Sequence, residues 1–351
     1  MSTLEHRLIF LTIVEPGYSR SWVYYAGLKS ITNNIDFIQI DKKNLIKSFK
    51  EIKQVLPKGC IFIVMSPSQY LVPLVRFFLG NKIVLDAGWS LFEGAIISRR
   101  RLGFLFNNAV KIYLIDLIAS ALSKIILLES KSQEKYYRKL LLVRKNKCRV
   151  LYTGLDEVSF KPSESVELPP DLFNNGKIVL FRGKQNFEAG LATLAEATLL
   201  LEKEPITFWV LTPDLSNEFN FSKNTIIERK HMESKGELAE FFKASCLVLG
   251  QMSDHARLDR TVPHKAFEAA FSGKPYLTAR AQGILEVFEE GREMACFSGG
   301  DSIDLANQIK MLTENPEQLL NLSNNIRIKY NNICSQKVLT KLFVQIVGQA
   351  F

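Results

Sequence analysis

An alternation of short apolar runs with segments of helical spacing is the feature that most constrains the fold, and it occurs twice. In the first half, runs such as RLIFLTIV, CIFIVM and KIVLD are separated by amphipathic segments. After a Pro-containing stretch, the alternation resumes with KIVLFR, ITFWVL and CLVLG. The runs lack strict polar alternation, which is typical of buried parallel strands. The sequence therefore predicts an α/β protein with two Rossmann-like, doubly wound domains.

The domain boundaries follow from the same pattern and from the length of 351 residues, which favours two domains. We expect an N-terminal domain over residues 1–155, a linker over 156–175 and a C-terminal domain over 176–334. A last helix over 335–351 could pack back on the first domain. Ligands bind beyond the carboxyl ends of parallel strands, so two such sheets facing each other would enclose a site in the cleft.

The composition excludes several classes of protein. With 47% hydrophobic and 23% charged residues the chain can form large cores, unlike a disordered protein. Its five cysteines form no CxxC pair, which argues against a disulfide scaffold, a zinc site and a thioredoxin motif. We expect neither a metal nor a cofactor. The N-terminus lacks the features of a signal peptide, so a cytoplasmic protein is expected.

The net charge of +9 is distributed unevenly. Residues 1–155 hold 24 Lys and Arg against 10 Asp and Glu, whereas the remainder holds 21 against 26. Such asymmetry predicts an anionic partner for the first half, unless the charge is only a solvated surface. Arg99, Arg100 and Arg101 precede an apolar stretch that begins at Leu102, which favours an anionic membrane surface. No finger spacing or RNP-like strand supports nucleic-acid binding.

Common catalytic and nucleotide-binding motifs are missing, including GxGxxG, the P-loop, HExxH and GxSxG. Glycines and cations instead follow predicted strands, where backbone N–H groups favour anions. Gly17 lies in the loop EPGYSRS after the opening strand, although a turn and cap would explain this loop equally well. Arg182, Gly183 and Lys184 end the run KIVLFR, and two cations around a glycine suit a pyrophosphate.

A second group of candidate ligands lies in the segment VPHKAFEAAFSGKP, which predicts a short helix. His264, Lys265 and Glu268 fall near its N-terminus. A lysine there suits phosphate, and a carboxylate suits ribose hydroxyls. The alternative is a surface ion pair between Lys265 and Glu268, which are three residues apart.

Three segments carry a resemblance to a known family: CRVLYTGLDEVSFKP, FRGKQNFEAGLATLAEA and the stretch from VPHKAFEAAFSGKP to SIDLANQI. Together they resemble glycosyltransferase family 4, whose members have the GT-B fold. The resemblance implies transfer of a sugar from a nucleoside diphosphate, with retention of configuration, to a glycan or a polyprenyl-linked acceptor. It also implies that Lys184, with Arg182, holds the diphosphate, that Glu268 binds the ribose and that Gly17 lies near the diphosphate.

Departures from the family pattern change the expected chemistry. Arg260 stands where the family has a glutamate, and Ala189 stands where it has a lysine. We expect Lys184, Arg260 and Lys265 to stabilise the departing diphosphate without a metal. The histidine of the family's first domain is missing, and Asp86 is the ionisable residue best placed there to contact the acceptor or act as base.

These expectations lead to one main interpretation and two alternatives. The main one is a glycosyltransferase of bacterial surface-polysaccharide assembly, peripheral to the cytoplasmic face of the membrane. The first alternative is a catalytically inactive GT-B-like partner subunit, motivated by the missing histidine and glutamate. The second is a nucleotide-sugar epimerase of similar shape, which would need carboxylates as acid and base.

Overall fold

A computed structural model of the 351-residue chain describes all residues except 1–5, 16, 18–19, 100–105, 162–176 and 230–234. The contacts within it divide the chain into two units. Unit 1 comprises residues 1–156 together with 336–351, and unit 2 comprises residues 157–335. The predicted linker over 156–175 falls mostly outside the described residues.

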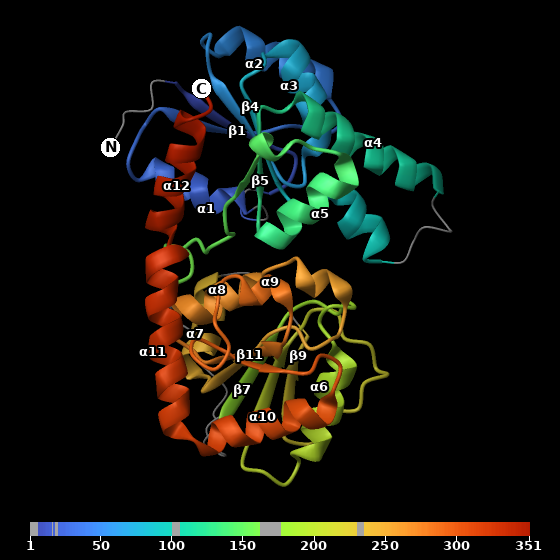
Figure 1. Ribbon diagram of the computed structural model, residues 1–351, viewed down its shortest axis with the longest axis vertical. Helices are drawn as coiled ribbons and strands as arrows, with labels where there is room; N and C mark the ends of the chain where they lie inside the picture. Colours follow the sequence, from blue (N-terminus) through green and yellow to red (C-terminus); the bar gives the residue numbers. More distant parts are fainter. Residues whose placement is uncertain (1–5, 16, 18–19, 100–105, 162–176, 230–234) are drawn as a thin grey trace. The chain divides into compact units, whose positions relative to one another are not determined.

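Unit 1 is a six-stranded parallel sheet with helices on both faces (Figure 1). Its strands are β1 (Leu8–Thr12), β2 (Ile35–Gln39), β3 (Ile61–Met65), β4 (Ile83–Gly88), β5 (Ile125–Leu128) and β6 (Cys148–Val150). Its helices are α1 (Ser21–Lys29), α2 (Leu45–Val55), α3 (Val72–Phe78), α4 (Phe106–Leu122), α5 (Lys131–Leu141) and α12 (Gln336–Gly348). The strand order is β2-β1-β3-β4-β5-β6, so the direction of winding changes between β1 and β3.

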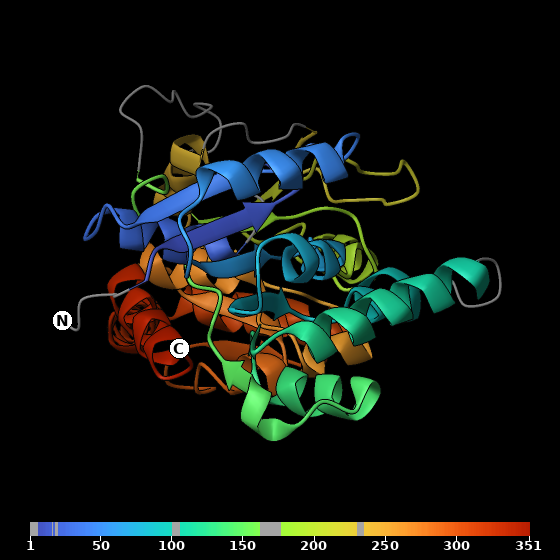
Figure 2. The same ribbon diagram turned by 90° about the horizontal axis from the view of Figure 1, so that it is seen from above.

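The two faces of this sheet carry separate cores, because successive strand side chains point to opposite faces. Helices α2, α3, α4 and α5 cover the face that includes Ile9 and Leu11. Helices α1 and α12 cover the face that includes Leu8 and Phe10. In Figure 2, α4 and α5 lie side by side, joined where the Tyr113 hydroxyl donates to the Leu140 carbonyl at 3.1 Å.

Helix α12 packs closely on α1 although more than 300 residues separate them. The ring of Phe343 stacks on Tyr24 with centroids 5.5 Å apart, and the Gln336 amide donates to the Val23 carbonyl at 2.9 Å. A Cβ on Gly27 would come within 2.0 Å of the Thr340 hydroxyl. The absence of a side chain at Gly27 is thus what allows the two helices to approach each other.

Unit 2 is also a six-stranded parallel sheet. Its strands are β7 (Ile178–Arg182), β8 (Thr207–Leu211), β9 (Thr225–Glu228), β10 (Leu247–Leu249), β11 (Tyr276–Ala279) and β12 (Ala295–Phe297). Its helices are α6 (Leu191–Leu200), α7 (Lys235–Ala244), α8 (His264–Phe271), α9 (Gln282–Leu285), α10 (Ser302–Glu314) and α11 (Pro316–Ile333). The order β12-β11-β10-β7-β8-β9 reverses between β7 and β10.

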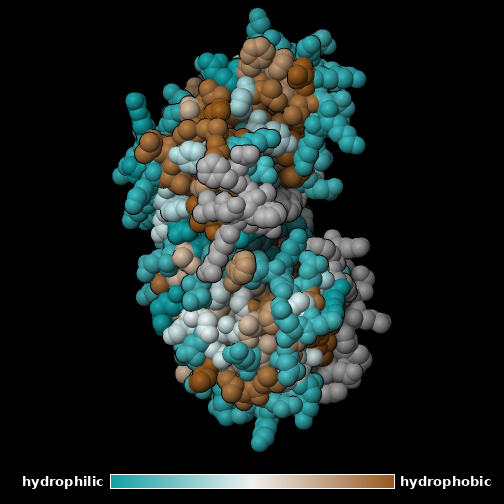
Figure 3. All heavy atoms as spheres, turned by 90° about the vertical axis from the view of Figure 1, so that its right-hand side faces the viewer, coloured by the Kyte–Doolittle hydropathy of each residue, from teal (hydrophilic) through white to brown (hydrophobic). Residues whose placement is uncertain are grey.

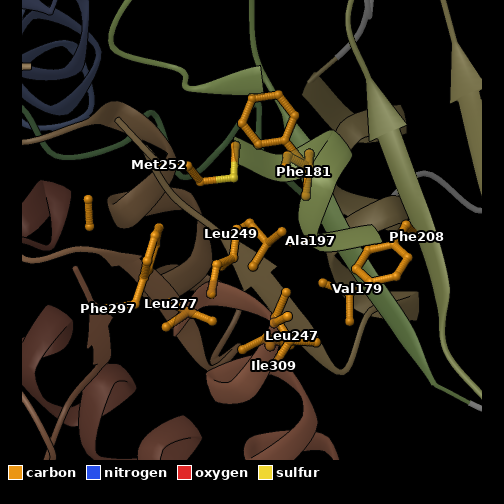
Figure 4. Close-up of a cluster of buried hydrophobic side chains, with 14 of the residues drawn as sticks. Val179, Phe181, Ala197, Phe208, Leu247, Leu249, Met252, Leu277, Phe297 and Ile309 are labelled. Carbon is orange, nitrogen blue, oxygen red and sulfur yellow. The ribbon is translucent and has the colours of Figure 1, made fainter. Parts of the chain in front are cut away.

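One face of the unit 2 sheet packs against α6 and α10 through the apolar cluster drawn in Figure 4. Phe181 from β7, Leu249 from β10 and Ile309 from α10 all contribute to it. This core fixes the neighbouring ends of β7 and β10. The predicted fold class, α/β with two doubly wound Rossmann-like domains, is confirmed.

Candidate functional site

In unit 2 the strand order reverses between β7 and β10, and open parallel sheets bind ligands beyond the carboxyl ends of their strands at such a switch point. Arg182 is the last residue of β7, and Gly183 and Lys184 follow it. The first turn of α8 carries His264 and Lys265, and Glu268 follows one turn after His264. The local sequence explains this start, because Pro263 takes an extended conformation before the helix and carries no N–H that needs a partner.

Arg182 and Glu268 form a two-pronged ion pair between the end of β7 and helix α8. The Arg182 Nε donates to Glu268 Oε2 at 2.7 Å, and a terminal nitrogen of Arg182 donates to Oε1. His264 Nδ1 also lies 3.0 Å from Oε1. Burial alone would raise the pKa of Glu268, but the Arg182 charge and the His264 hydrogen bond outweigh it and hold the pKa near 2. Glu268 is therefore ionised at all physiological pH values.

Lys265, predicted as a direct phosphate ligand, points into the unit instead. It is 6% exposed, and its Nζ donates to the Gly250 carbonyl at 3.2 Å and to the Gln251 side chain at 3.3 Å. The ammonium also lies 4.1 Å from the centre of the Phe181 ring. Burial lowers the pKa of Lys265 well below its usual value, and the Arg182 charge lowers it further. Lys265 is buried because it packs against the end of β7, through Phe181, and the residue after β10, Gly250.

Gly183 lies directly over the buried ammonium of Lys265. A Cβ on Gly183 would stand 3.3 Å from that Nζ, so a larger residue would crowd the cation. Lys184, the next residue, is exposed. Arg260 is partly exposed and follows a short 3-10 helix over Ala256–Asp259. The structure therefore places Arg182, Gly183 and Lys184 at the carboxyl end of β7, next to the start of α8. Lys265 lies beneath them.

An ion pair and a hydrogen bond, neither of which the sequence predicted, hold together the loops that follow β7 and β10. Arg257 pairs with Glu188 at 3.1 Å, and the Ser253 hydroxyl donates to the Glu188 carbonyl at 3.1 Å. A Cβ on Gly190 would lie 2.5 Å from the backbone nitrogen of Ser253. The loop after β7 and the loop after β10 are thus held so close together that position 190 has no room for a side chain.

In unit 1, Asp86 lies in β4 and is fully buried. Its carboxylate accepts hydrogen bonds from Arg20 Nε at 2.9 Å and from the Ser21 hydroxyl. The side chain of Arg20 is 3% exposed. Asp86, predicted as acceptor contact or base, thus has its two carboxylate oxygens directed at Arg20 and Ser21 and none at the surface.

The other predicted residues of unit 1 are only partly described. Gly17 is exposed in the loop before α1, and Arg99 is exposed after a π-helical turn over Glu93–Ile97. Arg100 and Arg101 lie outside the described residues. Helix α4 carries an exposed apolar stripe in which Val110, Leu114 and Ile118 are 43%, 45% and 45% exposed, respectively. Apolar patches of unit 1 are visible among hydrophilic residues in Figure 3.

In the part of the chain that the structure describes, no group of three or more His, Cys, Asp or Glu side chains could hold a metal ion. Among the helices described, none is long and apolar enough to cross a membrane.

Comparisons with known proteins agree with this topology. Residues 216–332 match the model of a family described as "Glycosyl transferase-like". HepE of Anabaena, in complex with UDP-glucose, superposes with a TM-score of 0.73 at 13% identity, covering 98% of this chain and 100% of HepE. The GT-B fold is shared. No curated protein sequence matches the chain.

Two further solved structures are similar over nearly their full length. Sucrose-phosphate synthase of Thermosynechococcus elongatus gives a TM-score of 0.71 at 14% identity, covering 98% of this chain and 99% of that one. A glycosyltransferase of Rickettsia africae gives 0.69 at 12% identity, covering 99% of each. At such low identity these likenesses establish the GT-B fold of the chain and nothing about its substrates.

Sequence reasoning missed Arg20, although a signal for it exists. Asp86 is a single carboxylate inside a strand whose residues are all buried, and an ionised group in such a place needs a cation. Arg20, next to Ser21 after the first strand, was the available partner. The pairing of Glu188 with Arg257 gave no comparable signal, because both lie in polar loops.

Proposed function

We propose that the chain is a glycosyltransferase that moves a sugar from a nucleoside diphosphate to an acceptor. The observation that carries this proposal is the pair of cations at the switch point of unit 2, where Arg182 ends β7 and Lys184 follows it, beside the start of α8. The GT-B fold and the family match over 216–332 support it. HepE was solved with UDP-glucose, so uridine nucleotides are the first donors to test.

The proposed mechanism is electrostatic and retains the configuration of the sugar. The departing diphosphate gains negative charge as the bond to the sugar breaks, so fixed cations bind the transition state better than the ground state. We assign this role to Arg182, Lys184 and Arg260, with no metal. Lys265, buried beneath Gly183, is not assigned a contact with the diphosphate.

Thermal unfolding with UDP, GDP, dTDP, ADP and CMP tests the donor site. A nucleotide at a hundred times its dissociation constant should add about 2.7 kcal/mol of stability. Lys184→Ala should lose most of this gain. Lys203→Ala, an exposed lysine of unit 2 near the amino end of β8, should keep it. No stabilisation by any nucleotide would favour the inactive partner subunit, and binding without turnover of a labelled UDP-sugar would do the same.

We further propose that unit 1 holds a glycan or polyprenyl-linked acceptor at the cytoplasmic face of the membrane, in surface-polysaccharide assembly. The excess of Lys and Arg in residues 1–155 and the apolar stripe of α4 support this. Binding to anionic vesicles should weaken as salt rises, because charges are screened within about 10 Å at 0.1 M. Leu114→Ser should weaken it as well, whereas Leu199→Ser on α6 should not. Binding that ignores both salt and Leu114 would contradict the proposal.

A further inference from the structure

A cavity of about 240 Å³ lies in unit 2 at the start of α11. Gly291 and Arg292, which come before β12, line one side, and the other side is lined by the first three turns of α11 and its N-cap, Asn315. Residues before a strand of this parallel sheet lie at its amino end, whereas Arg182 and Lys184 lie at the carboxyl end. In Figure 1 the start of α11 is at the end of unit 2 opposite to α8. The cavity is therefore separate from the candidate donor site.

Carboxamide side chains make up half of the eight residues that line this cavity, namely Asn315, Gln318, Asn321 and Asn325. The last three are spaced i, i+3 and i+7, so they lie along one face of α11. Asn315 caps the helix by accepting from the Gln318 backbone N–H at 3.0 Å. Within the described part of the chain, the side-chain amides of Gln318, Asn321 and Asn325 have no hydrogen-bond partner. Each can therefore both donate to and accept from a ligand.

The rest of the lining suits a small and neutral ligand. Leu322 is 1% exposed and belongs to the core of unit 2, so it gives the cavity an apolar part. Arg292 and Glu317 bring one positive and one negative charge, and Arg292 also donates to Glu289 at 3.4 Å. A charged ligand would thus meet no net countercharge. The volume is below the range of about 300–1,000 Å³ that is typical of sites for drug-sized ligands.

The asparagines on this face are unfavourable for the helix that carries them. Asn is a poor helix former, because its side chain competes for the backbone hydrogen bonds. Asn321 and Asn325 nevertheless lie in the interior of the 18-residue helix α11. Residues that conflict with local preference and have no structural partner are expected where function requires them.

We propose that this cavity binds one neutral sugar residue of a glycan chain, apart from the donor site. Sugar hydroxyls donate and accept hydrogen bonds as carboxamides do, and the C–H groups of a sugar ring can pack against Leu322. Asn315 and Asn321 are exposed, so the cavity opens at the surface, where the glycan chain can continue. The inference does not depend on the proposed function, because it follows from the lining of the cavity alone.

Saturation-transfer NMR of the full chain with sugar probes tests the proposal. The probes are the methyl glycosides of glucose, galactose, mannose and N-acetylglucosamine, which represent a residue within a chain, and the corresponding free sugars. At least one glycoside should bind, and an excess of UDP should not displace it. The double variant Asn321→Ala/Asn325→Ala should weaken binding by more than about tenfold, because each lost hydrogen bond weakens it by about fivefold.

Asn324→Ala is the matched control, since Asn324 is an exposed asparagine of α11 that does not line the cavity. It should leave sugar binding unchanged. The control and the double variant should both have a slightly raised melting temperature, because Ala is the better helix former. A lowered melting temperature of the double variant would show that the two amides are needed by the fold, and would overturn the proposal.

The remaining outcomes separate this inference from the proposed function. Displacement of the sugar by UDP would place the sugar in the donor site, which overturns the inference and supports the proposed function. Binding of free sugars without any glycoside, or of inorganic phosphate in place of any sugar, would overturn the inference as well. A chain that binds a glycoside through Asn321 and Asn325 but binds no nucleotide upholds the inference and refutes the proposed donor site.

Discussion

Removal of Asp86 should destabilise unit 1 strongly, because Asp86 and Arg20 form a buried ion pair. The Arg20 Nε lies 2.9 Å from the carboxylate, and the two side chains are 3% and 0% exposed. Loss of one partner from such a pair typically costs about 3–5 kcal/mol, because the other charge stays buried and unpaired. We therefore expect Asp86→Ala and Arg20→Met each to lower the free energy of unfolding by about this amount.

The double variant Arg20→Met/Asp86→Ala should lose less than the sum of the single losses, by at least about 2 kcal/mol, because no unpaired charge remains. Arg7 and Asp36 provide a matched control in the same unit, since their ion pair at 2.5 Å has side chains that are 41% and 32% exposed. Asp36→Ala should cost less than about 1 kcal/mol.

Urea unfolding combined with hydrogen exchange resolved by peptide measures these losses, because exchange separates unit 1 from unit 2. Protection should fall in the peptides of α1 and β4 and stay unchanged in unit 2. Additive single effects would refute the buried-pair reasoning. So would an Asp86→Ala variant of normal stability that loses only its transferase activity, since that would be the behaviour of an acceptor base.

Three further predictions concern other parts of the chain. The pKa of Asp116 is raised from 3.8 to about 6, chiefly by burial. The protonated carboxyl therefore stabilises the folded protein by about 3 kcal/mol below about pH 4, and this contribution is lost as the pH rises through about 6. Asp116→Asn should flatten this part of the dependence of the unfolding free energy on pH, as measured by urea unfolding. Gly190 has a φ of +66° and no room for a Cβ beside Ser253, so Gly190→Ala should lower the melting temperature, and an unchanged value would contradict the contact. Phe343→Ala should destabilise unit 1 by about 3–5 kcal/mol through a core cavity, with lost exchange protection in α1 rather than in unit 2.

The sequence predicted the fold well because the relevant signals are local. The apolar run RLIFLTIV contains β1, and KIVLFR contains β7. Each run is short, β-branched and bounded by turn residues, and the spacing of the helical segments between them requires parallel connections. The order of strands within each sheet follows from winding rules that operate on such units.

The candidate site was predicted less completely, because its pairings are distant in the sequence. Arg182 and Glu268 are 86 residues apart, and nothing in either segment specifies that one will neutralise the other. Lys265 was expected to face a phosphate beside Glu268, on the reasoning that residues three apart share a helix face. Both do lie on one face, but that face rests on the carboxyl ends of β7 and β10, so burial was decided by the packing of α8 rather than by its own sequence.

Each unit has an arginine near its first strand that pairs with a buried carboxylate. The two pairs differ in how exposed the arginine is, and this difference indicates different roles. Arg20 lies between β1 and α1 in unit 1, and Arg182 is the last residue of β7, the first strand of unit 2. Arg20 is 3% exposed and Arg182 is 27% exposed, so only the second can offer N–H groups to a ligand. In unit 1 both charges are enclosed, and the pair acts on stability. In unit 2 the carboxylate is enclosed and the cation faces outward, which is the arrangement that a fixed anion ligand requires.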